Sequence, residues 1–447
     1  MATAKKIFID SQNVGLWGRV KQTDEAAAKA TELLQKDLEA SIVLQSGNSS
    51  IGLTMLTSHH LLTLYGTGAN AAHLQKGFDD NTGYQRPPMP THPHVVEDLR
   101  SWGDHAGKYL GQDQYYPDFL AFFQEEVAGK GWEAVVSEYL LAGTEAADDL
   151  LVRLHGSVIH PLIQLMFGME WGQPAIVAEA LAQTCVHKDE LKRELYAAEK
   201  SAGEEYGEKG EKKRMPSIVS LMKAAQEQPG LAKVESENRY WEWIADGLPD
   251  EVLRIMSKVK VAPEELDERT VEMFNTVMFA AAGAAFHPPK LNKFNFFFIH
   301  FVNAAPLYLI INAQPWIPIE TKVRLLEWKI RQDLFLYAVI GVPDLPLEEI
   351  KAYQPSDPAT TSVTDIISKY HPMEDEGHAV KLARAAAICQ DVSKEYEDRE
   401  WMVIKGDDMW LRVHHLILDS ITSPGKKWVW GQGHEEAWKD IPDRPHL

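Results

Sequence analysis

The sequence predicts an all-α protein built as a single large multi-helix domain. Apolar residues recur at helical spacing in several long segments, whereas strand-like alternation is confined to the short stretches 5–10 and 41–45. Prolines and glycines fall between the helical segments, where they end helices or form turns. No linker-like composition interrupts the 447 residues, so we expect one domain over 1–447.

The expected helices follow one another along the chain. Each repeats apolar side chains at positions i, i+3, i+4 and i+7, which places them on one face; the segments are 24–41, 118–141, 150–168, 175–200, 270–283 and 321–341. The stretch 199–217 is charged, rich in glycine and without an apolar face. We therefore expect a mobile surface loop there.

Charge and cysteine content exclude several classes of protein. The formal net charge is −20, which opposes binding to nucleic acid, and no basic patch with interleaved aromatic residues occurs. Only Cys185 and Cys389 are present, too few for a disulfide framework or a cysteine-rich metal site. The N-terminus lacks an apolar region of signal-peptide length, and the most apolar stretch, 294–312, is broken by polar residues and a proline. A cytoplasmic protein without a membrane partner is expected.

Three familiar site motifs do not fit their surroundings. The stretch GTGANA at 66–71 matches a dinucleotide fingerprint, but it follows a helical pattern and lacks the later acidic residue, so a glycine-capped helix end is expected. A Glu-x-x-His pair, which a ferritin-like di-iron site needs, is absent from the sequence. His187 and Asp189 have the spacing of a facial triad, but side chains two apart on a helix diverge.

Histidines in apolar helical context are the strongest chemical signal. They occur in separate segments, and the last is followed one helical turn later by Lys381: His60, His160, His187, His300 and His378. A single such histidine is most often a core residue with one hydrogen bond. Several on different helices favour a metal cage, because neutral imidazole is the commonest metal ligand, and iron, copper or zinc would suit it. Histidines beside prolines or near the C-terminus, such as His371, His414 and His415, are expected at the surface.

Several stretches together resemble the fungal questin-oxidase-like family. They include HHLLTLYGTGA, RLHGSVIHPLIQLMFGMEWGQPAIVAEALAQTCVH, NFFFIHFVNA and DEGHAVKLARA, in this order along most of the chain. The resemblance implies an enzyme that uses O2 to open the ring of an anthraquinone-type polyketide. It implies either Baeyer–Villiger chemistry with NADPH, or non-haem iron bound by histidines and a carboxylated lysine. Members often carry His-Asn-His before the histidine pair, where this chain has GLTML at 52–56.

The resemblance also implies roles for individual residues. The implied metal ligands are His60, His160, His187, His300 and Lys381, the last as a carbamate formed with CO2. His378 is the alternative fourth histidine, or it orients the carbamate and transfers protons. Asn303 is likewise assigned a catalytic or supporting role. Carbamate formation needs a lowered lysine pKa, which burial supplies. The alternative for Lys381 is a salt bridge to Asp375 or Glu376.

Three functions are compared. The first is an iron-dependent oxygenase acting on a polycyclic aromatic substrate and O2, with a pocket lined by Phe167, Phe297, Phe301 and Tyr308. The second is an NADPH- or flavin-dependent Baeyer–Villiger monooxygenase on the same substrate class. The third is a helical scaffold whose histidines are all structural. The sequence does not decide the oligomeric state.

Overall fold

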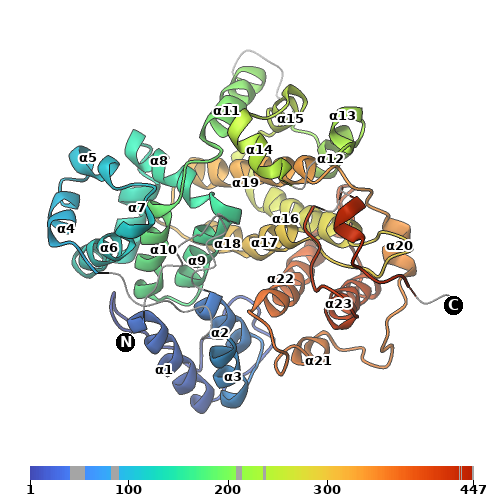
Figure 1. Ribbon diagram of the computed structural model, residues 1–447, viewed down its shortest axis with the longest axis horizontal. Coiled ribbons are helices and arrows are strands. Elements are labelled where there is room, and N and C mark those ends of the chain that lie inside the picture. The colour runs from blue at the N-terminus through green and yellow to red at the C-terminus, as the bar shows by residue number, and fades with distance from the viewer. Residues whose placement is uncertain are drawn as a thin grey trace. The chain divides into compact units, whose positions relative to one another are not determined.

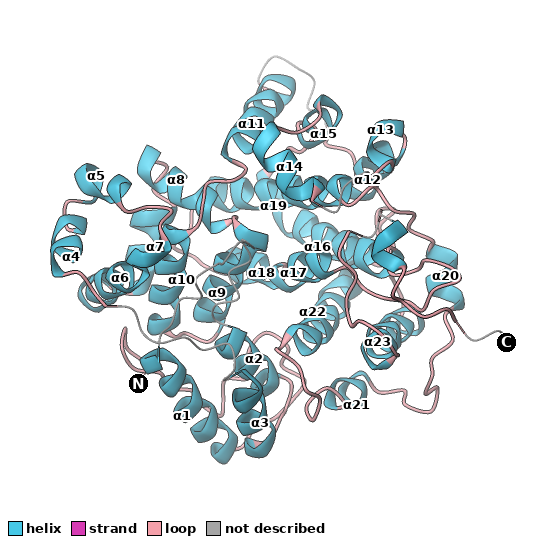
Figure 2. Cartoon of the chain, viewed as in Figure 1, coloured by secondary structure: helices cyan, strands magenta, loops and turns pink. Residues whose placement is uncertain are grey.

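The computed structural model describes residues 1–40, 56–81, 90–207, 214–234, 238–431, 433 and 435–444. These residues form helices joined by loops, without a strand among them, which confirms the predicted all-α class (Figures 1 and 2). The chain forms two compact units, one of residues 1–190 with 367–384 and the other of 191–366 with 385–447. The expectation of one domain over 1–447 stays a prediction.

The first unit is built from the N-terminal helices. They are α1 (Asp24–Ala40), α2 (Leu56–Gly66), α3 (Ala71–Asn81), α4 (Pro93–Leu99), α5 (Trp102–His105), α6 (Tyr116–Lys130), α7 (Trp132–Leu140), α8 (Glu145–Leu154), α9 (His160–Glu170) and α10 (Pro174–Val186). Helix α10 packs against both α9 and α6, while α1, α2 and α3 pack on one another. Helices α9 and α10 are buried on nearly every side, which explains why their sequences are apolar throughout.

The second unit contains the remaining helices. Two of them are shared with the first unit: α21 ends in the first unit, and α22 begins in it. They are α11 (Lys192–Tyr206), α12 (Ile218–Gln226), α13 (Pro229–Ala232), α14 (Arg239–Asp246), α15 (Asp250–Met256), α16 (Leu266–Gly283), α17 (Phe296–Ala304), α18 (Pro306–Asn312), α19 (Ile319–Val339), α20 (Leu347–Ala352), α21 (Val363–Ser368), α22 (His378–Ser393) and α23 (Asp407–Thr422). Helices α16 and α19 pack on each other, and both contact α17 and α18. This core positions His300 and the aromatic residues around it.

Several expected helices are divided in the structure. The segment 118–141 becomes α6 and α7 because Gly131 between them has a φ of 83°, a left-handed conformation that ends a helix. The segment 175–200 becomes α10 and α11, because the backbone at His187 turns extended and ends α10. The segment 150–168 is divided before Pro161, where the backbone turns left-handed and a new helix begins at His160.

The expected surface loop at 199–217 is wrong in its first part. Residues 199–206 continue helix α11, whose buried face is formed by Leu195, Ala198 and Ala202. Two of these residues are alanines, whose side chains are small, so the sequence shows no strong apolar stripe. Residues 208–213 lie outside the described part of the chain.

The glycine motif at 66–71 is confirmed as a helix end. Helix α2 ends at Gly66, and the amide of Ala69 donates a 2.9 Å hydrogen bond to the carbonyl of Leu64. Gly68 takes a φ of 91°, as a helix-terminating glycine does. Because a helix precedes the motif, its glycines do not form the strand-to-helix turn of a dinucleotide site.

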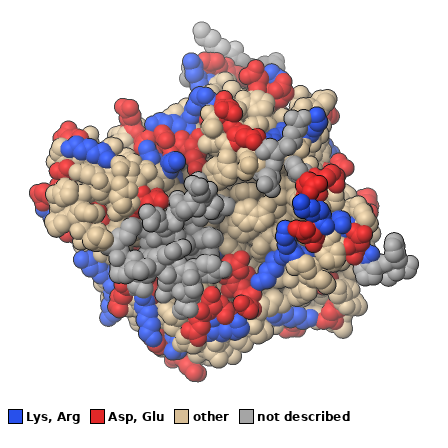
Figure 3. Space-filling model, viewed as in Figure 1, with Lys and Arg blue, Asp and Glu red and all other residues tan. Residues whose placement is uncertain are grey.

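The strand-like stretch 5–10 forms no strand, and 41–45 lies outside the described residues. Among the described residues, every helix is too short or too polar to cross a lipid bilayer. On the face drawn in Figure 3, acidic and basic side chains are interspersed over the surface.

Candidate active site

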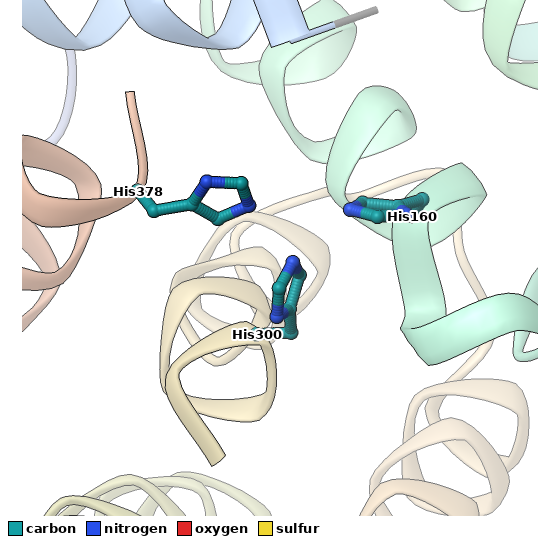
Figure 4. A group of neighbouring side chains, drawn as sticks. All are labelled: His160, His300 and His378. Carbon is teal, nitrogen blue, oxygen red and sulfur yellow. The ribbon is translucent and has the colours of Figure 1, made fainter. Parts of the chain in front are cut away.

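Three buried histidines form the group with the clearest ligand geometry. His160, His300 and His378 each offer one ring nitrogen, and these nitrogens lie within 4.8 Å of one another. All three side chains are buried, and their rings point toward one another in Figure 4. They stand at the first residue of α9, in the middle of α17 and at the first residue of α22. This spacing is short enough for one metal ion to bind all three imidazoles.

The backbone before His160 is strained. Val158 and Ile159 both have a φ of 56°, a conformation that β-branched residues rarely adopt. Pro161 then occupies the first turn of α9, where a missing amide hydrogen costs nothing. Strain of this kind persists only where the surrounding structure holds it in place, and it is common at functional sites. Here it fixes the position of His160.

Gly377 sets the position of His378. Its φ is 92°, and a Cβ added to it would lie 2.7 Å from the Cβ of His60. Two residues earlier, Asp375 accepts a 3.0 Å hydrogen bond from the Ala379 amide and so caps the start of α22. The carboxylate of Glu376 lies 3.3 Å from Nδ1 of His378. The loop before α22 therefore brings the His378 and His60 segments into close contact.

Gly377→Ala is expected to destabilise the protein by about 2 kcal/mol or more, because left-handed strain and a clash with His60 add together. Gly406→Ala is the matched control, since Gly406 also has a positive φ, of 75°, but its added Cβ would meet nothing within 4 Å. Urea unfolding of both variants measures the difference. Equal destabilisation would show that the contact between Gly377 and His60 is unimportant.

Lys381 differs from the other buried lysines. Lys293 donates to the carbonyls of Ser420 and Ser423, Lys322 to that of Asn312, and Lys329 to Asp333. Among the described residues, Nζ of Lys381 has neither a hydrogen bond nor an ion pair, although its side chain is only 3% exposed. Lys381 therefore does not form the alternative salt bridge to Asp375 or Glu376 in this structure. Burial lowers the pKa of Lys381 to about 8, while Asp375 and Glu376 partly oppose the shift.

His59 was not among the residues predicted from sequence, yet it belongs to the same surroundings. Neither of its ring nitrogens has a hydrogen bond of normal geometry to a described residue. Burial lowers the pKa of His59 well below its ordinary value, and the charges of Lys381 and His160 lower it further. Its ring stacks on Phe167 with centroids 5.0 Å apart.

The predicted His60 lies close by. Nδ1 of His60 is 3.0 Å from the side-chain amide nitrogen of Asn81. Burial lowers the pKa of His60 to about 3, and the charge of Lys381 contributes to this shift. Both histidines of the pair are therefore neutral at pH 7, the form in which imidazole binds a metal. Because α2 is buried on every side, its sequence has no apolar stripe that would distinguish His59 from His60.

Helix α17 supplies the polar residues His300 and Asn303. Nδ1 of His300 lies 2.6 Å from the carbonyl of Phe296 and donates its hydrogen to it, so Nε2 keeps a lone pair. Asn303 lies one helical turn later, and neither polar atom of its amide has a hydrogen bond to a described residue. Asn303 therefore stands on the same face of α17 as His300, and its predicted catalytic or supporting role stays a prediction.

His187 stands apart from the three-histidine group. It follows the last turn of α10, its Nδ1 lies 2.6 Å from the carbonyl of Gln183, and its own carbonyl accepts from Arg153. The helix assumed for His187 and Asp189 ends before them, so that argument against their pairing is wrong. Burial lowers the pKa of His187 to about 4. His371, His414 and His415, expected at the surface, are buried.

An ion pair fixes α22 against α9 within the first unit. Glu170, the last residue of α9, pairs with Arg384, and both side chains are at most 3% exposed. Glu170 also accepts a 2.7 Å hydrogen bond from the amide of Leu16. Arg384 lies three residues after Lys381, so this pair orients the helix face that carries Lys381.

Comparison with known proteins assigns the chain to a family. Residues 56–386 match a family model described as questin oxidase-like, and this range includes every candidate ligand above. The chain belongs to the questin oxidase-like family. An oxidoreductase of Aspergillus parasiticus is 33% identical over 89% of this chain and 86% of its own length. A Baeyer–Villiger monooxygenase of Cryptosporiopsis is 32% identical over 99% of both chains, and a questin oxidase of Aspergillus fumigatus is 32% identical over 99% of this chain and 100% of its own.

The residues of this questin oxidase-like chain fit a metal ion. Buried neutral imidazoles on different helices are the usual ligands of iron, copper and zinc. In the described part of the chain, neither ring nitrogen of His59 has a hydrogen bond of normal geometry and Nζ of Lys381 has none, and both side chains are buried, where an unpartnered polar atom is costly. A ligand that satisfies them would remove this cost.

The aromatic residues predicted to line a substrate pocket are all buried in this questin oxidase-like protein. Phe167 stacks on His59, Phe297 stacks on Tyr240 with centroids 5.5 Å apart, and Phe301 lies 5.3 Å from Nζ of Lys329. Two cavities of the second unit, of about 340 and 380 Å³, are lined by other residues, such as Trp438 and Phe279. The pocket therefore stays a prediction.

Proposed function

We propose that this chain is a non-haem iron oxygenase that uses O2 to oxidise the ring of an anthraquinone-type aromatic polyketide. Membership of the questin oxidase-like family supports the substrate class and the reaction type, since relatives are named questin oxidase and Baeyer–Villiger monooxygenase. One observation carries the proposal of a metal. A buried lysine without a partner among the described residues lies among the buried imidazoles of His59, His60 and His378.

The proposed ligands are His160, His300, His378 and a carbamate on Lys381, with a further imidazole from His59 or His60. His378 is thereby preferred to His187 as a ligand, because its ring nitrogen belongs to the group that lies within 4.8 Å and that of His187 does not. In carbamate formation the neutral amine of Lys381 attacks CO2, a C–N bond forms, and the amine loses a proton to solvent. The lowered pKa of about 8 supplies neutral amine near physiological pH.

A carbamate would give the neutral histidines an anionic oxygen donor, and that mixture favours iron. Bound iron would supply the binding and reduction of O2. The chain itself excludes water from the site, since His160, His300 and His378 are fully buried. It also fixes which nitrogen of His300 faces the site, through the hydrogen bond to Phe296. Asn303, with an unsatisfied amide one turn away, would hydrogen-bond to substrate or to a bound water.

The second candidate is a Baeyer–Villiger monooxygenase that depends on NADPH or a flavin and needs no metal. The names of several relatives favour Baeyer–Villiger chemistry. The glycine motif at 66–71 gives this candidate no cofactor site, because it ends a helix instead of following a strand. Baeyer–Villiger oxygen insertion at an iron centre is compatible with the first candidate.

Metal analysis distinguishes these functions. Protein purified without a histidine tag is expected to contain about one iron per chain by mass spectrometry, to show no flavin absorbance, and to consume O2 with a hydroxyanthraquinone. Loading with iron and bicarbonate should improve as the pH rises through about 8, because Lys381 is increasingly neutral above its pKa. Turnover that survives chelation, together with a bound flavin, would instead establish the second candidate. A protein with neither metal nor turnover would be a scaffold.

A further inference from the structure

A second buried charged group lies on α19 in the second unit. Lys329 and Asp333 stand one turn apart on α19, and their side chains are at most 2% exposed. The ammonium of Lys329 donates to Oδ1 of Asp333, lies 3.7 Å from Sδ of Met273, and lies 5.3 Å from the ring centre of Phe301. Each of these contacts stabilises a buried cation, so the needs of Lys329 are met within the protein.

Two buried oxygens, one on Asp333 and one on Tyr308, lack such partners among the described residues. Oδ2 of Asp333 and the hydroxyl of Tyr308 are both buried, and neither has a hydrogen bond to a described residue. Tyr308 stands on α18, which packs against α19, and the charge of Asp333 adds to the effect of burial in raising the pKa of Tyr308. A carboxylate oxygen can only accept a hydrogen bond, whereas a phenol can both donate and accept. Together they match a ligand that carries a hydroxyl group.

Stability does not explain this arrangement. Replacing a buried ion pair by apolar residues of similar size is often neutral or stabilising, so the pair is weak evidence of a structural role. Burial raises the pKa of Asp333 to about 6, and the ammonium of Lys329 limits this rise, so the carboxyl is mainly charged at pH 7. The result is a buried anionic acceptor beside a phenol and near the ring of Phe301. Aromatic and polar groups in this combination are typical of sites for hydroxylated aromatic molecules.

We propose that Asp333 and Tyr308 bind a phenolic hydroxyl of the aromatic substrate, with Asp333 accepting the hydrogen bond from it and Tyr308 donating one to the same oxygen. The inference rests on the proposed function for the substrate class, and it adds a requirement for a ring hydroxyl. Lys329 acts as a positioning residue that holds the Asp333 carboxylate. The alternative occupant is a buried water, which would satisfy the same oxygens without any preference among ligands.

The test compares two probes, 2-hydroxyanthraquinone and anthraquinone, which differ by one hydroxyl that is too far from the quinone carbonyls to bond to them internally. Binding to the full-length, metal-depleted protein is followed by quenching of tryptophan fluorescence, so neither iron nor turnover is needed. The wild-type protein is expected to bind the hydroxylated probe about tenfold more tightly or better, as a hydrogen bond to a charged group allows. Tyr308→Phe should reduce this preference several-fold, and Asp333→Asn should remove it, while affinity for anthraquinone stays unchanged.

Tyr308→Phe decides the question even where Asp333→Asn fails to fold, because it removes an oxygen that no described residue uses. Tyr337→Phe is the matched control: Tyr337 is equally buried, but its hydroxyl donates a 2.7 Å hydrogen bond to the carbonyl of Pro343. This control should lower thermal stability and leave the preference intact. A folded Tyr308→Phe protein with the full wild-type preference, or a wild-type protein without one, would overturn the inference and leave water as the occupant.

The outcomes also separate this inference from the proposed function. A wild-type protein that shows the Tyr308-dependent preference but contains no iron and consumes no O2 would refute the function and keep the hydroxyl site. A protein that turns over with iron, but whose preference does not change in Tyr308→Phe, would refute only the hydroxyl site.

Discussion

Lys381→Arg is expected to lose iron and oxygenase activity together, each by more than about tenfold. Arginine stays cationic and cannot form a carbamate, so it would place a positive charge where the proposal needs an anionic oxygen. Lys381→Ala should lose both properties as well, and added bicarbonate or a short carboxylic acid should restore part of the metal content by filling the vacated space. Iron by mass spectrometry and O2 uptake are the measurements.

Lys293→Ala is the control for this substitution. Lys293 is also fully buried, and burial also lowers its pKa to about 8, but its Nζ bonds to two backbone carbonyls. The control should cost about 1–3 kcal/mol of stability, because those carbonyls lose their donor, and it should keep its iron. An active Lys381→Arg enzyme with normal iron would refute the carbamate, since a lysine needed only for its positive charge tolerates arginine.

His300→Ala is expected to remove most of the iron and to abolish O2 consumption. The hydrogen bond from Nδ1 to Phe296 leaves Nε2 as the atom available for a metal, and alanine supplies no replacement in a fully buried site. The measurements are iron content and the near-ultraviolet absorbance of the loaded protein.

His415→Ala provides the comparison for His300→Ala. His415 is a buried histidine of the same unit, and its Nε2 lies 2.8 Å from the carbonyl of Thr360, so it has a structural partner. We expect this variant to be less stable but fully loaded. Full iron occupancy in His300→Ala would remove His300 from the proposed ligands.

The sequence predicted the helices better than their ends. Spacing of apolar residues identified α1, which buries one face at helical spacing, and α16 and α19, which are buried along nearly their whole length. It missed the breaks at Gly131 and His187, where a single backbone angle ends one helix within a continuous apolar pattern. Such a break depends on contacts made far away in the chain, and periodicity carries no information about those contacts.

The candidate site was predictable to a similar degree. Apolar context pointed to His160, His300 and His378, which the structure brings together, but the same context also pointed to His187, which lies apart. Helix α2 is buried on all sides, so the sequence could not show that His59, as well as His60, lies near Lys381. Lys329 and Asp333 were missed because charges one turn apart usually mark an exposed helix face, whereas α19 is buried all round.

The burial of His160, His300 and His378 also has a kinetic consequence. With these side chains at 0% exposure, an ion bound among them would exchange with solvent only when the protein opens locally. Its release rate would then follow the frequency of that opening, so a chelator would remove it at a rate independent of chelator concentration once the chelator is in excess. Mild urea or heat, which raise the opening frequency, would speed the release well below the midpoint of global unfolding.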